Sequence, residues 1–358
     1  MFFCFLSFDV KFVPDKNLKT FWIEFRSKLV ITNTSKTKTP EMKVIDIISQ
    51  NKKTVFSFEL LPPLKGNDAS KIYNTIENLL DFDPKYINIT THRDEMVYVE
   101  LPDGKIEKRI VRKRPGTVAI AANIQYKYGI PVVPHILCGG FTKSETEHVL
   151  IDLNFMGIQN VLALRGDGNK TDHVFRPETN GHSSANQLVE QIVNLKNGRY
   201  LDPELKNTAQ MDFCIGVAGY PEKHFESPNP EIDLQYLKQK VDAGADYIVT
   251  QMFFDNRKYY QFVDRCRAAG IQVPIIPGLK PINLRNQLTV LPKIFSIDIP
   301  VELANELSRC KTDEDAKLVG TEWAIQQAKD LVAHQVPSIH IYTYGVSDNT
   351  RKIVEAVF

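Results

Sequence analysis

The sequence predicts an α/β protein, a single-domain (β/α)8 (TIM) barrel without a Rossmann fold. From Thr54 onward, short runs rich in β-branched and aromatic residues alternate regularly with helical patterns. We expect strands at residues 54–59, 86–90, 131–137, 160–165, 213–219, 246–252, 273–277 and 338–343. Eight such units over roughly 290 residues suit a barrel, whose usual size is about 250 residues. A doubly wound open sheet is the runner-up, but the chain lacks the strand–GxGxxG–helix pattern of a dinucleotide site.

Three helical patterns between these strands have recognisable ends. The segment 142–157 begins with Thr142 and Glu145 at the spacing of a capping box and stops at a glycine. The segments 232–244 and 259–270 also stop at a glycine. The predicted alternation therefore rests on helix boundaries as well as on strand composition.

The composition excludes several classes of protein. The chain carries 44 Lys and Arg against 43 Asp and Glu, without a basic cluster, so no electric field attracts nucleic acid or an anionic membrane. Its five cysteines lie far apart, with no CxxC and no Cys/His spacing that suits a metal. No apolar run approaches the ~20 residues that span a bilayer. We expect a cytoplasmic protein with reduced thiols and no metal, nucleic acid or membrane partner.

The first part of the chain differs from the rest. It begins with MFFCFLSFDV, which starts like a signal peptide but lacks a basic n-region and a small-residue cleavage site. TNTSKTKTP at 32–40 is typical of a polar linker, and a natural domain start follows at Met42. We expect a poorly ordered N-terminal extension over 1–41 and the barrel over 42–358.

Polar side chains follow nearly every predicted strand, whereas the strand bodies are Val, Ile, Leu and Ala. Chemistry in such barrels takes place at the carboxyl ends of the strands. Glu59 ends the first strand, directly before Leu-Leu-Pro-Pro, whose prolines fix the backbone. It is either a solvated acid or a partly desolvated carboxyl with a raised pKa, which suits a general acid.

Other strand ends also allow two interpretations. Asp167 in RGDG either pairs with Arg165 or presents a fixed anion to a developing cation. His135 is either a satisfied histidine of the barrel or a ligand contact, and the amide of Gln251 suits recognition of a heterocycle edge. None of these signals is specific alone.

Taken together, the strand-end motifs resemble one family. In chain order they are FSFELLPP, NITT, PHILC, NVLALRGD, IGVAGYPEKH, KQKVDAGADYIVTQMFFD, GIQVPIIPGLKPI and HIYTYG, between Val44 and Tyr344. This series resembles the methylenetetrahydrofolate reductase family. The resemblance implies a flavoprotein barrel that holds FAD and uses NADH or NADPH to reduce 5,10-methylenetetrahydrofolate to 5-methyltetrahydrofolate. It also implies a homo-oligomer in one-carbon metabolism and methionine biosynthesis.

The resemblance also implies roles for single residues. Glu59 matches the general acid that protonates N10 of the folate, and Asp167 matches the carboxylate beside flavin and pterin. Glu59, Gln251 and Tyr342 match substrate-binding positions. The positions that match FAD contacts are Thr90, His135, Arg165, Gly166, Asp167, Tyr220 and Lys240.

Three positions depart from the family pattern. Leu137 stands where relatives carry a threonine, and Gln239 stands where a basic FAD contact is expected. Arg285 falls where an aromatic residue would stack near nicotinamide or folate. These departures leave the choice between NADH and NADPH and the packing of the pterin open.

Two further expectations and two alternatives complete the interpretation. The loop 168–186 carries His182 and Ser184, which we expect to approach the FAD, and since the chain ends at Phe358 we expect no feedback by S-adenosylmethionine. One alternative is a pterin-binding methyltransferase that needs no flavin. The other is a non-catalytic barrel that keeps folate or flavin as a sensor or partner subunit.

Overall fold

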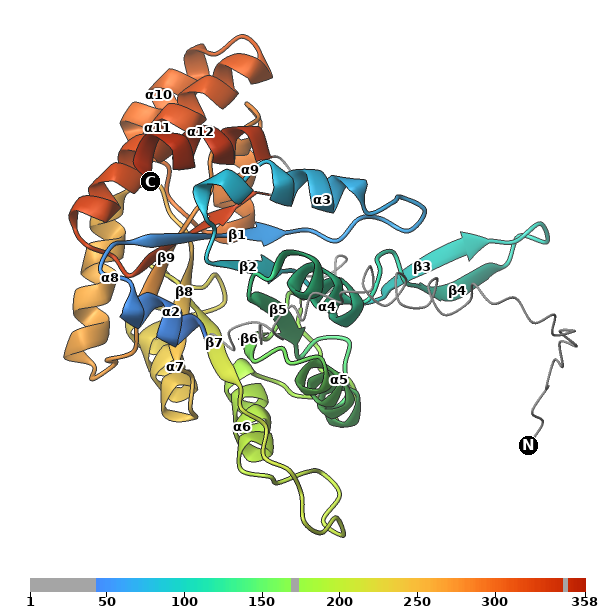
Figure 1. The fold of residues 1–358 in the computed structure, drawn as a ribbon. Helices are drawn as coiled ribbons and strands as arrows, with labels where there is room; N and C mark the ends of the chain where they lie inside the picture. Colours follow the sequence, from blue (N-terminus) through green and yellow to red (C-terminus); the bar gives the residue numbers. More distant parts are fainter. Residues whose placement is uncertain (1–42, 169–173, 344–346) are drawn as a thin grey trace, which may run out of the picture. The chain divides into compact units, whose positions relative to one another are not determined.

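The computed structural model describes residues 43–168, 174–343 and 347–358, so the extension predicted over 1–41 lies outside the described residues. Eight parallel strands of this part form a closed barrel in the order β1-β10-β9-β8-β7-β6-β5-β2 (Figure 1). They are β1 (Val55–Leu60), β2 (Tyr86–Ile89), β5 (Val132–Leu137), β6 (Asn160–Leu164), β7 (Cys214–Gly219), β8 (Tyr247–Met252), β9 (Ile275–Leu279) and β10 (Ser338–Tyr342). The predicted barrel is confirmed, with every strand within two residues of its expected bounds.

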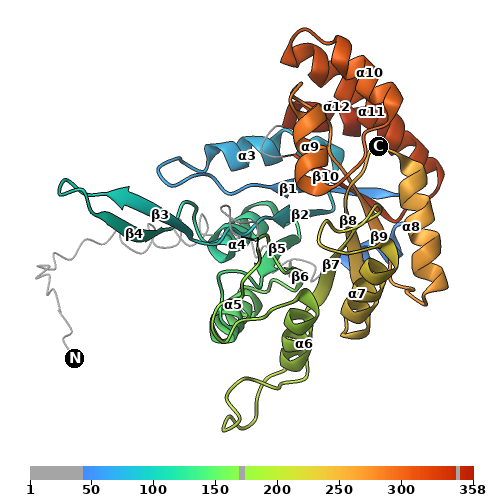
Figure 2. The ribbon, with the colours of Figure 1, turned by 180° about the vertical axis from the view of Figure 1, so that it is seen from behind.

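Helices alternate with the strands along the chain, and all but α2 cover the outside of the barrel (Figures 1 and 2). Along the chain they are α2 (Val44–Gln50), α3 (Ser70–Glu77), the 3-10 helix η1 (Leu80–Phe82), α4 (Thr117–Tyr128), α5 (Lys143–Phe155), α6 (Ala185–Lys196), α7 (Pro230–Asp242), α8 (Asn256–Ala268), α9 (Gln287–Phe295), α10 (Val301–Arg309), α11 (Asp313–Ala333) and α12 (Ser347–Val357). Most of their buried faces share one apolar core with the outer faces of the strands, whereas α9 and α10 pack in a second cluster with Met252, Phe254 and Ile282.

Local hydrogen bonds explain where the predicted helices begin. The capping box of α5 is confirmed, because Thr142 Oγ1 accepts from Glu145 N at 3.2 Å and the Glu145 carboxylate accepts from Thr142 N at 2.8 Å. Helix α7 begins two residues earlier than expected, because the Asn229 side chain caps it and Pro230 occupies its first position. Helix α8 begins at Asn256 rather than 259, because the Asp255 carboxylate accepts the Arg257 N–H at 3.0 Å.

The helix α2 closes the amino-terminal end of the barrel. Its buried residues Val44 and Ile47 belong to an apolar cluster with the buried Tyr86 and Tyr247 inside the barrel. Val44 N also donates to the Asn160 side chain at 2.8 Å. Among the described residues, side chains fill this end, and ligand sites of such barrels lie at the opposite, carboxyl ends of the strands.

An antiparallel hairpin, absent from the sequence prediction, lies between β2 and α4. Its strands are β3 (Glu95–Glu100) and β4 (Ile106–Val111), paired from Glu95 with Val111 to Glu100 with Ile106. It projects away from the barrel (Figure 1), and the side chains of β4 are exposed or half-buried. The hairpin therefore adds nothing to the barrel core.

Gly320, in the interior of α11, provides a test of the packing between that helix and the segment after β9. A Cβ at this position would collide with the Ile282 carbonyl and lie 2.8 Å from its Cα. Helix propensity alone predicts that Gly320→Ala stabilises the protein by about 1 kcal/mol. We expect destabilisation by about 1–3 kcal/mol instead, since the helix has to move.

Denaturant unfolding measures this difference. Gly116→Ala is the control, because Gly116 has a φ of −67° and no atom within 4 Å of an added Cβ. The control should change stability by less than about 1 kcal/mol. A stabilised Gly320→Ala variant would contradict the close approach.

Candidate functional site

Glu59 is the buried acid at the carboxyl end of β1. The residue is 8% exposed, and its backbone carbonyl accepts from Thr343 Oγ1 at 2.5 Å. Burial raises the pKa of Glu59 to about 8, although the charge of Lys280 opposes this rise. The carboxyl group is therefore protonated near neutral pH, as a general acid requires.

His135, on β5, faces Glu59 across the barrel. Its Nε2 lies 3.8 Å from Glu59 Oε2 and is buried without a hydrogen-bond partner among the described residues. Burial, and secondarily the charge of His92, lowers the pKa of His135 to about 3. His135 is therefore neutral at physiological pH, so it does not supply the charge that would ionise Glu59.

Tyr342, at the end of β10, and Gln251, near the end of β8, lie at the mouth of the barrel, which is formed by the carboxyl ends of the strands. The Tyr342 hydroxyl donates to the Thr250 carbonyl at 2.7 Å. Gly278 on β9 makes room for this ring, since a Cβ there would lie 2.6 Å from it. The Gln251 side-chain oxygen accepts from Met252 N at 2.9 Å, which fixes the amide at the end of β8.

Arg165 directly follows β6 and lines a cavity. Its guanidinium donates to Glu226 at 2.5 Å and lies 4.7 Å from the centroid of the Phe175 ring. The cavity has a volume of about 490 Å³. It is lined by Arg165, Val174, Phe175, Pro177, Ser183, Phe225 and Glu226. Aromatic and charged groups in this combination suit a ligand that has both a flat ring system and anionic groups.

Lys240, on α7, supplies a second cation close to Arg165. Its ammonium donates to the Ala218 carbonyl at 2.5 Å and lies 5.9 Å from the centroid of the Tyr220 ring. Burial lowers the pKa of Lys240 to about 8; Asp233 opposes this shift and the charge of Arg165 adds to it. Two cations thus lie near each other at the ends of β6 and β7, with Glu226 paired to Arg165 and Asp233 acting on Lys240.

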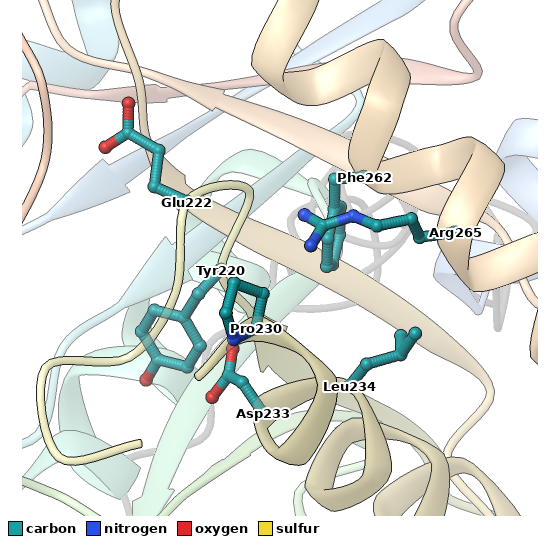
Figure 3. A pocket seen from close by; sticks show the side chains of 7 residues that line it. All are labelled: Tyr220, Glu222, Pro230, Asp233, Leu234, Phe262 and Arg265. Carbon is teal, nitrogen blue, oxygen red and sulfur yellow. The ribbon is translucent and has the colours of Figure 1, made fainter. Parts of the chain in front are cut away.

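Tyr220 also lines a separate, much smaller pocket beside Asp233 at the start of α7 (Figure 3). The volume of this pocket is about 10 Å³, which holds at most one water molecule. Glu222 lies on its edge and accepts from Asp298 N at 2.8 Å, so it ties down the segment before α10. This pocket is therefore a packing feature rather than a ligand site.

Three predicted residues lie in loops around the mouth. Thr90 follows β2, and its hydroxyl lies 3.2 Å from His92 Nε2. Gly166 follows β6 with a φ of 86°, a conformation that only glycine adopts without strain. Asp167 is exposed just after it, two residues before the segment 169–173 that lies outside the described residues. Their roles stay predictions.

The positions that depart from the family pattern, and the loop histidine, have definite surroundings. Arg285 is exposed and donates to the Lys311 carbonyl at 3.1 Å. Gln239 is exposed on α7, and Leu137 lies beside Gly166. His182 bonds the Gln191 side chain at 2.5 Å and so fastens its loop to α6.

Lys280, Glu226 and Asp233 are site residues that were not predicted from the sequence. Lys280 directly follows β9 and is 5% exposed. The rule that polar residues at strand ends form the site could have selected it, but the predicted strand stopped at residue 277. Glu226 and Asp233 carry no motif of their own, since only the folded chain brings them to Arg165 and Lys240.

The fold and this arrangement define a (β/α)8-barrel protein with a polar, partly buried site at the carboxyl ends of its strands. Among the described residues, no group of three or more His, Cys, Asp or Glu side chains could hold a metal ion. No helix within the described ranges has the length and apolarity needed to cross a membrane.

Comparison with known proteins gives the family. The model of the methylenetetrahydrofolate reductase family matches residues 43–357, and the chain belongs to this family. It is 33% identical over 318 residues to methylenetetrahydrofolate reductase (NADH) 1 of Arabidopsis thaliana, which covers 85% of this chain and 49% of that protein. It is 32% identical over 288 residues to 5,10-methylenetetrahydrofolate reductase of Escherichia coli, which covers 80% of this chain and 85% of that protein. The chain thus spans about half the length of the plant relative.

A solved structure shares the fold. It is an uncharacterized protein from Clostridium thermocellum that binds two copies of 5-methyl-5,6,7,8-tetrahydrofolic acid. The TM-score is 0.53 at 14% identity, over 87% of this chain and 96% of that one. At this identity the match supports the barrel architecture alone.

The buried carboxyl of Glu59 should make stability depend on pH. In the unfolded chain it ionises with the ordinary glutamate pKa of 4.5, whereas in the folded protein it keeps its proton up to about pH 8. Between these values the unfolded state binds fewer protons, so wild-type stability falls as pH rises. Glu59→Gln removes this contribution. The free energy of unfolding of the variant, relative to that of wild type, should therefore increase by on the order of 2–4 kcal/mol from about pH 5 to 8.

Denaturant unfolding of both proteins at the two pH values measures this change. Glu204→Gln is the control, because Glu204 is exposed and its substitution should leave the pH dependence as it is in wild type. The same difference between Glu59→Gln and wild type at both pH values would contradict the raised pKa.

Proposed function

We propose that this protein reduces 5,10-methylenetetrahydrofolate to 5-methyltetrahydrofolate, with FAD as bound cofactor and NADH or NADPH as electron donor. Membership of the methylenetetrahydrofolate reductase family supports the reaction class. The observation that carries the proposal is Glu59, an acid that burial keeps protonated near neutral pH in the open end of the barrel. A barrel that only bound folate would not require a proton donor at this position.

Glu59 would act on the methylene bridge of the substrate. The bridge joins N5 and N10, and the carbon can accept a hydride only after the bond to N10 breaks. Glu59 donates its proton to N10, directly or through one water molecule, and the bond opens to a 5-iminium cation. The barrel mouth excludes bulk water around the acid, so the proton remains available for this step.

Asp167, Gln251 and Tyr342 would hold the substrate for this step. The Asp167 carboxylate places a negative charge beside the iminium cation and stabilises it. The amide of Gln251, fixed by Met252 N, presents donor and acceptor groups to the pterin edge. Tyr342, anchored on the Thr250 carbonyl, offers an aromatic surface on the substrate side.

The residues at the ends of β6 and β7 fit a bound FAD. Arg165 and Lys240 bring two cations together, and both would donate hydrogen bonds to the dinucleotide phosphates. Thr90, His135, Gly166 and Tyr220 would supply the remaining contacts. When bound, FAD would supply the transfer of hydride from the nicotinamide to the folate.

The proposal extends to the setting of the reaction. Residues 42–358 would form the catalytic barrel, and the protein would act as a cytoplasmic homo-oligomer in one-carbon metabolism. Its product would supply methyl groups for methionine biosynthesis. Its partners would then be the two small-molecule substrates.

An anaerobic stopped-flow experiment tests the reaction and the role of Glu59. NADH or NADPH should bleach the flavin absorbance of the purified protein, and methylenetetrahydrofolate should restore it. In Glu59→Gln we expect bleaching at the wild-type rate, but recovery slowed by at least about a hundredfold, because the proton donor is lost.

Three other outcomes contradict parts of this proposal. Bleaching without recovery in wild type would indicate a flavin reductase with another acceptor. A protein without flavin would favour the pterin-binding methyltransferase. Wild-type recovery in Glu59→Gln would remove Glu59 from the general-acid role.

Lys240→Met tests the cofactor site. The variant loses a half-buried cation that we assign to the FAD phosphates, so its Kd for FAD should rise about tenfold or more. Fluorescence titration of the flavin-free protein measures this constant. The control is Lys238→Met on the same helix, because Lys238 pairs with Asp242 at the surface and should leave the constant unchanged. Equal constants for both variants would exclude Lys240 from the site.

A further inference from the structure

Glu59, Tyr342 and Lys280 lie in one row across three adjacent strands. Glu59 on β1 pairs with Tyr342 on β10, and Ile341 pairs with Leu279 on β9. Lys280, which follows Leu279, therefore lies beside Tyr342. Because adjacent strands are about 4.8 Å apart, the backbones of Glu59 and Lys280 are about 10 Å apart, within the combined reach of their side chains.

Glu59 on β1, His135 on β5 and Lys280 directly after β9 each adjoin a strand residue of the outer apolar core. Because side chains alternate along a strand, all three side chains point into the barrel. Glu59, His135 and Lys280 come from these strands and are 8%, 6% and 5% exposed. A lysine is rarely so buried unless a partner group requires it.

Lys280 supplies the positive charge that acts on Glu59. Among the other groups that face the acid, His135 is neutral, the Tyr342 hydroxyl is bound to a carbonyl, and Asn88 on β2 is uncharged. His340 on β10 is also neutral, since burial lowers its pKa to about 3. Burial lowers the pKa of Lys280 to about 8, and the charge of Glu59 opposes that shift.

We propose that Lys280 is a positioning residue for the proton of Glu59, and that its ammonium makes this buried acid able to release the proton to the substrate. The inference rests on the proposed role of Glu59 as general acid. Without the charge of Lys280, burial would raise the pKa of Glu59 further, so the carboxyl group would hold its proton more tightly. An acid that holds its proton too tightly transfers it slowly. Lys280 thus affects both the rate at which Glu59 protonates the substrate and the pH above which Glu59 no longer carries a proton.

Infrared titration of the protein as purified measures the proton on Glu59 directly. The C=O band of the protonated carboxyl is assigned by its disappearance in Glu59→Gln, and its amplitude is followed against pH. Lys280→Met should shift the midpoint upward by about one pH unit, because a favourable charge is lost. Lys280→Arg should keep the wild-type midpoint, and so should Lys293→Met, which changes an exposed lysine on α9.

The kinetic prediction has the same sign. In Lys280→Met the flavin recovery on adding folate should slow about tenfold near neutral pH, and its loss at alkaline pH should begin about one unit higher. The bleaching by NADH or NADPH should keep its pH profile. A residue that only fills space would lower the rate at every pH without moving either midpoint.

Two results overturn the inference. One is an unchanged infrared midpoint in Lys280→Met and in Lys280→Gln, the second neutral variant in case the first does not fold. The other is a shift of equal size in Lys280→Arg. Failure of the proposed function looks different, because the wild-type protein would then show no folate-dependent recovery while the infrared titration would still report whether Lys280 controls Glu59.

Discussion

The pairing of β1 between β10 and β2 is the constraint on which the site depends. The five residues of β1 that end at Glu59 pair in register with the five residues of β10 that end at Tyr342. Because side chains alternate along a strand, a slip of one residue would turn Glu59 out of the barrel. The buried bond between Ser57 and His340, 283 residues apart in the chain, opposes that slip. Closure of the barrel, which joins distant parts of the chain, is therefore what buries the acid.

The barrel strands were predictable from the sequence because burial determines their composition. Strands covered on both sides consist of near-continuous apolar residues, and prolines and glycines mark their ends. The hairpin β3–β4 follows neither rule, since β4 (IEKRIV) is exposed and its charged residues do not alternate strictly with apolar ones. Its stability depends on cross-strand pairs such as Val97 with Arg109, which a pattern based on burial does not detect.

The candidate site could be predicted only in part. Glu59 was recognisable because an acid after an apolar run and before two prolines is unusual in a strand. The importance of Lys280 depends on register, since β10 lies between β9 and β1 and brings together residues 221 positions apart in the chain. The pair of Arg165 with Glu226 also joins different loops and has no fixed spacing in sequence. Strand ends thus identify the mouth, whereas the charge balance within it comes from the fold.

Lys240 and Lys280 show how one physical effect acts at two parts of the site. Burial lowers the pKa of Lys240 and of Lys280 to about 8. An anionic ligand beside Lys240 would favour its charged form, so binding there would draw in a proton and gain affinity. The proposed iminium cation near Lys280 would disfavour the charged form of that lysine, and the carboxylate left on Glu59 after proton transfer would favour it. The Lys280 ammonium therefore stabilises the carboxylate that Glu59 becomes when it gives up its proton, which is the product of the proton-transfer step.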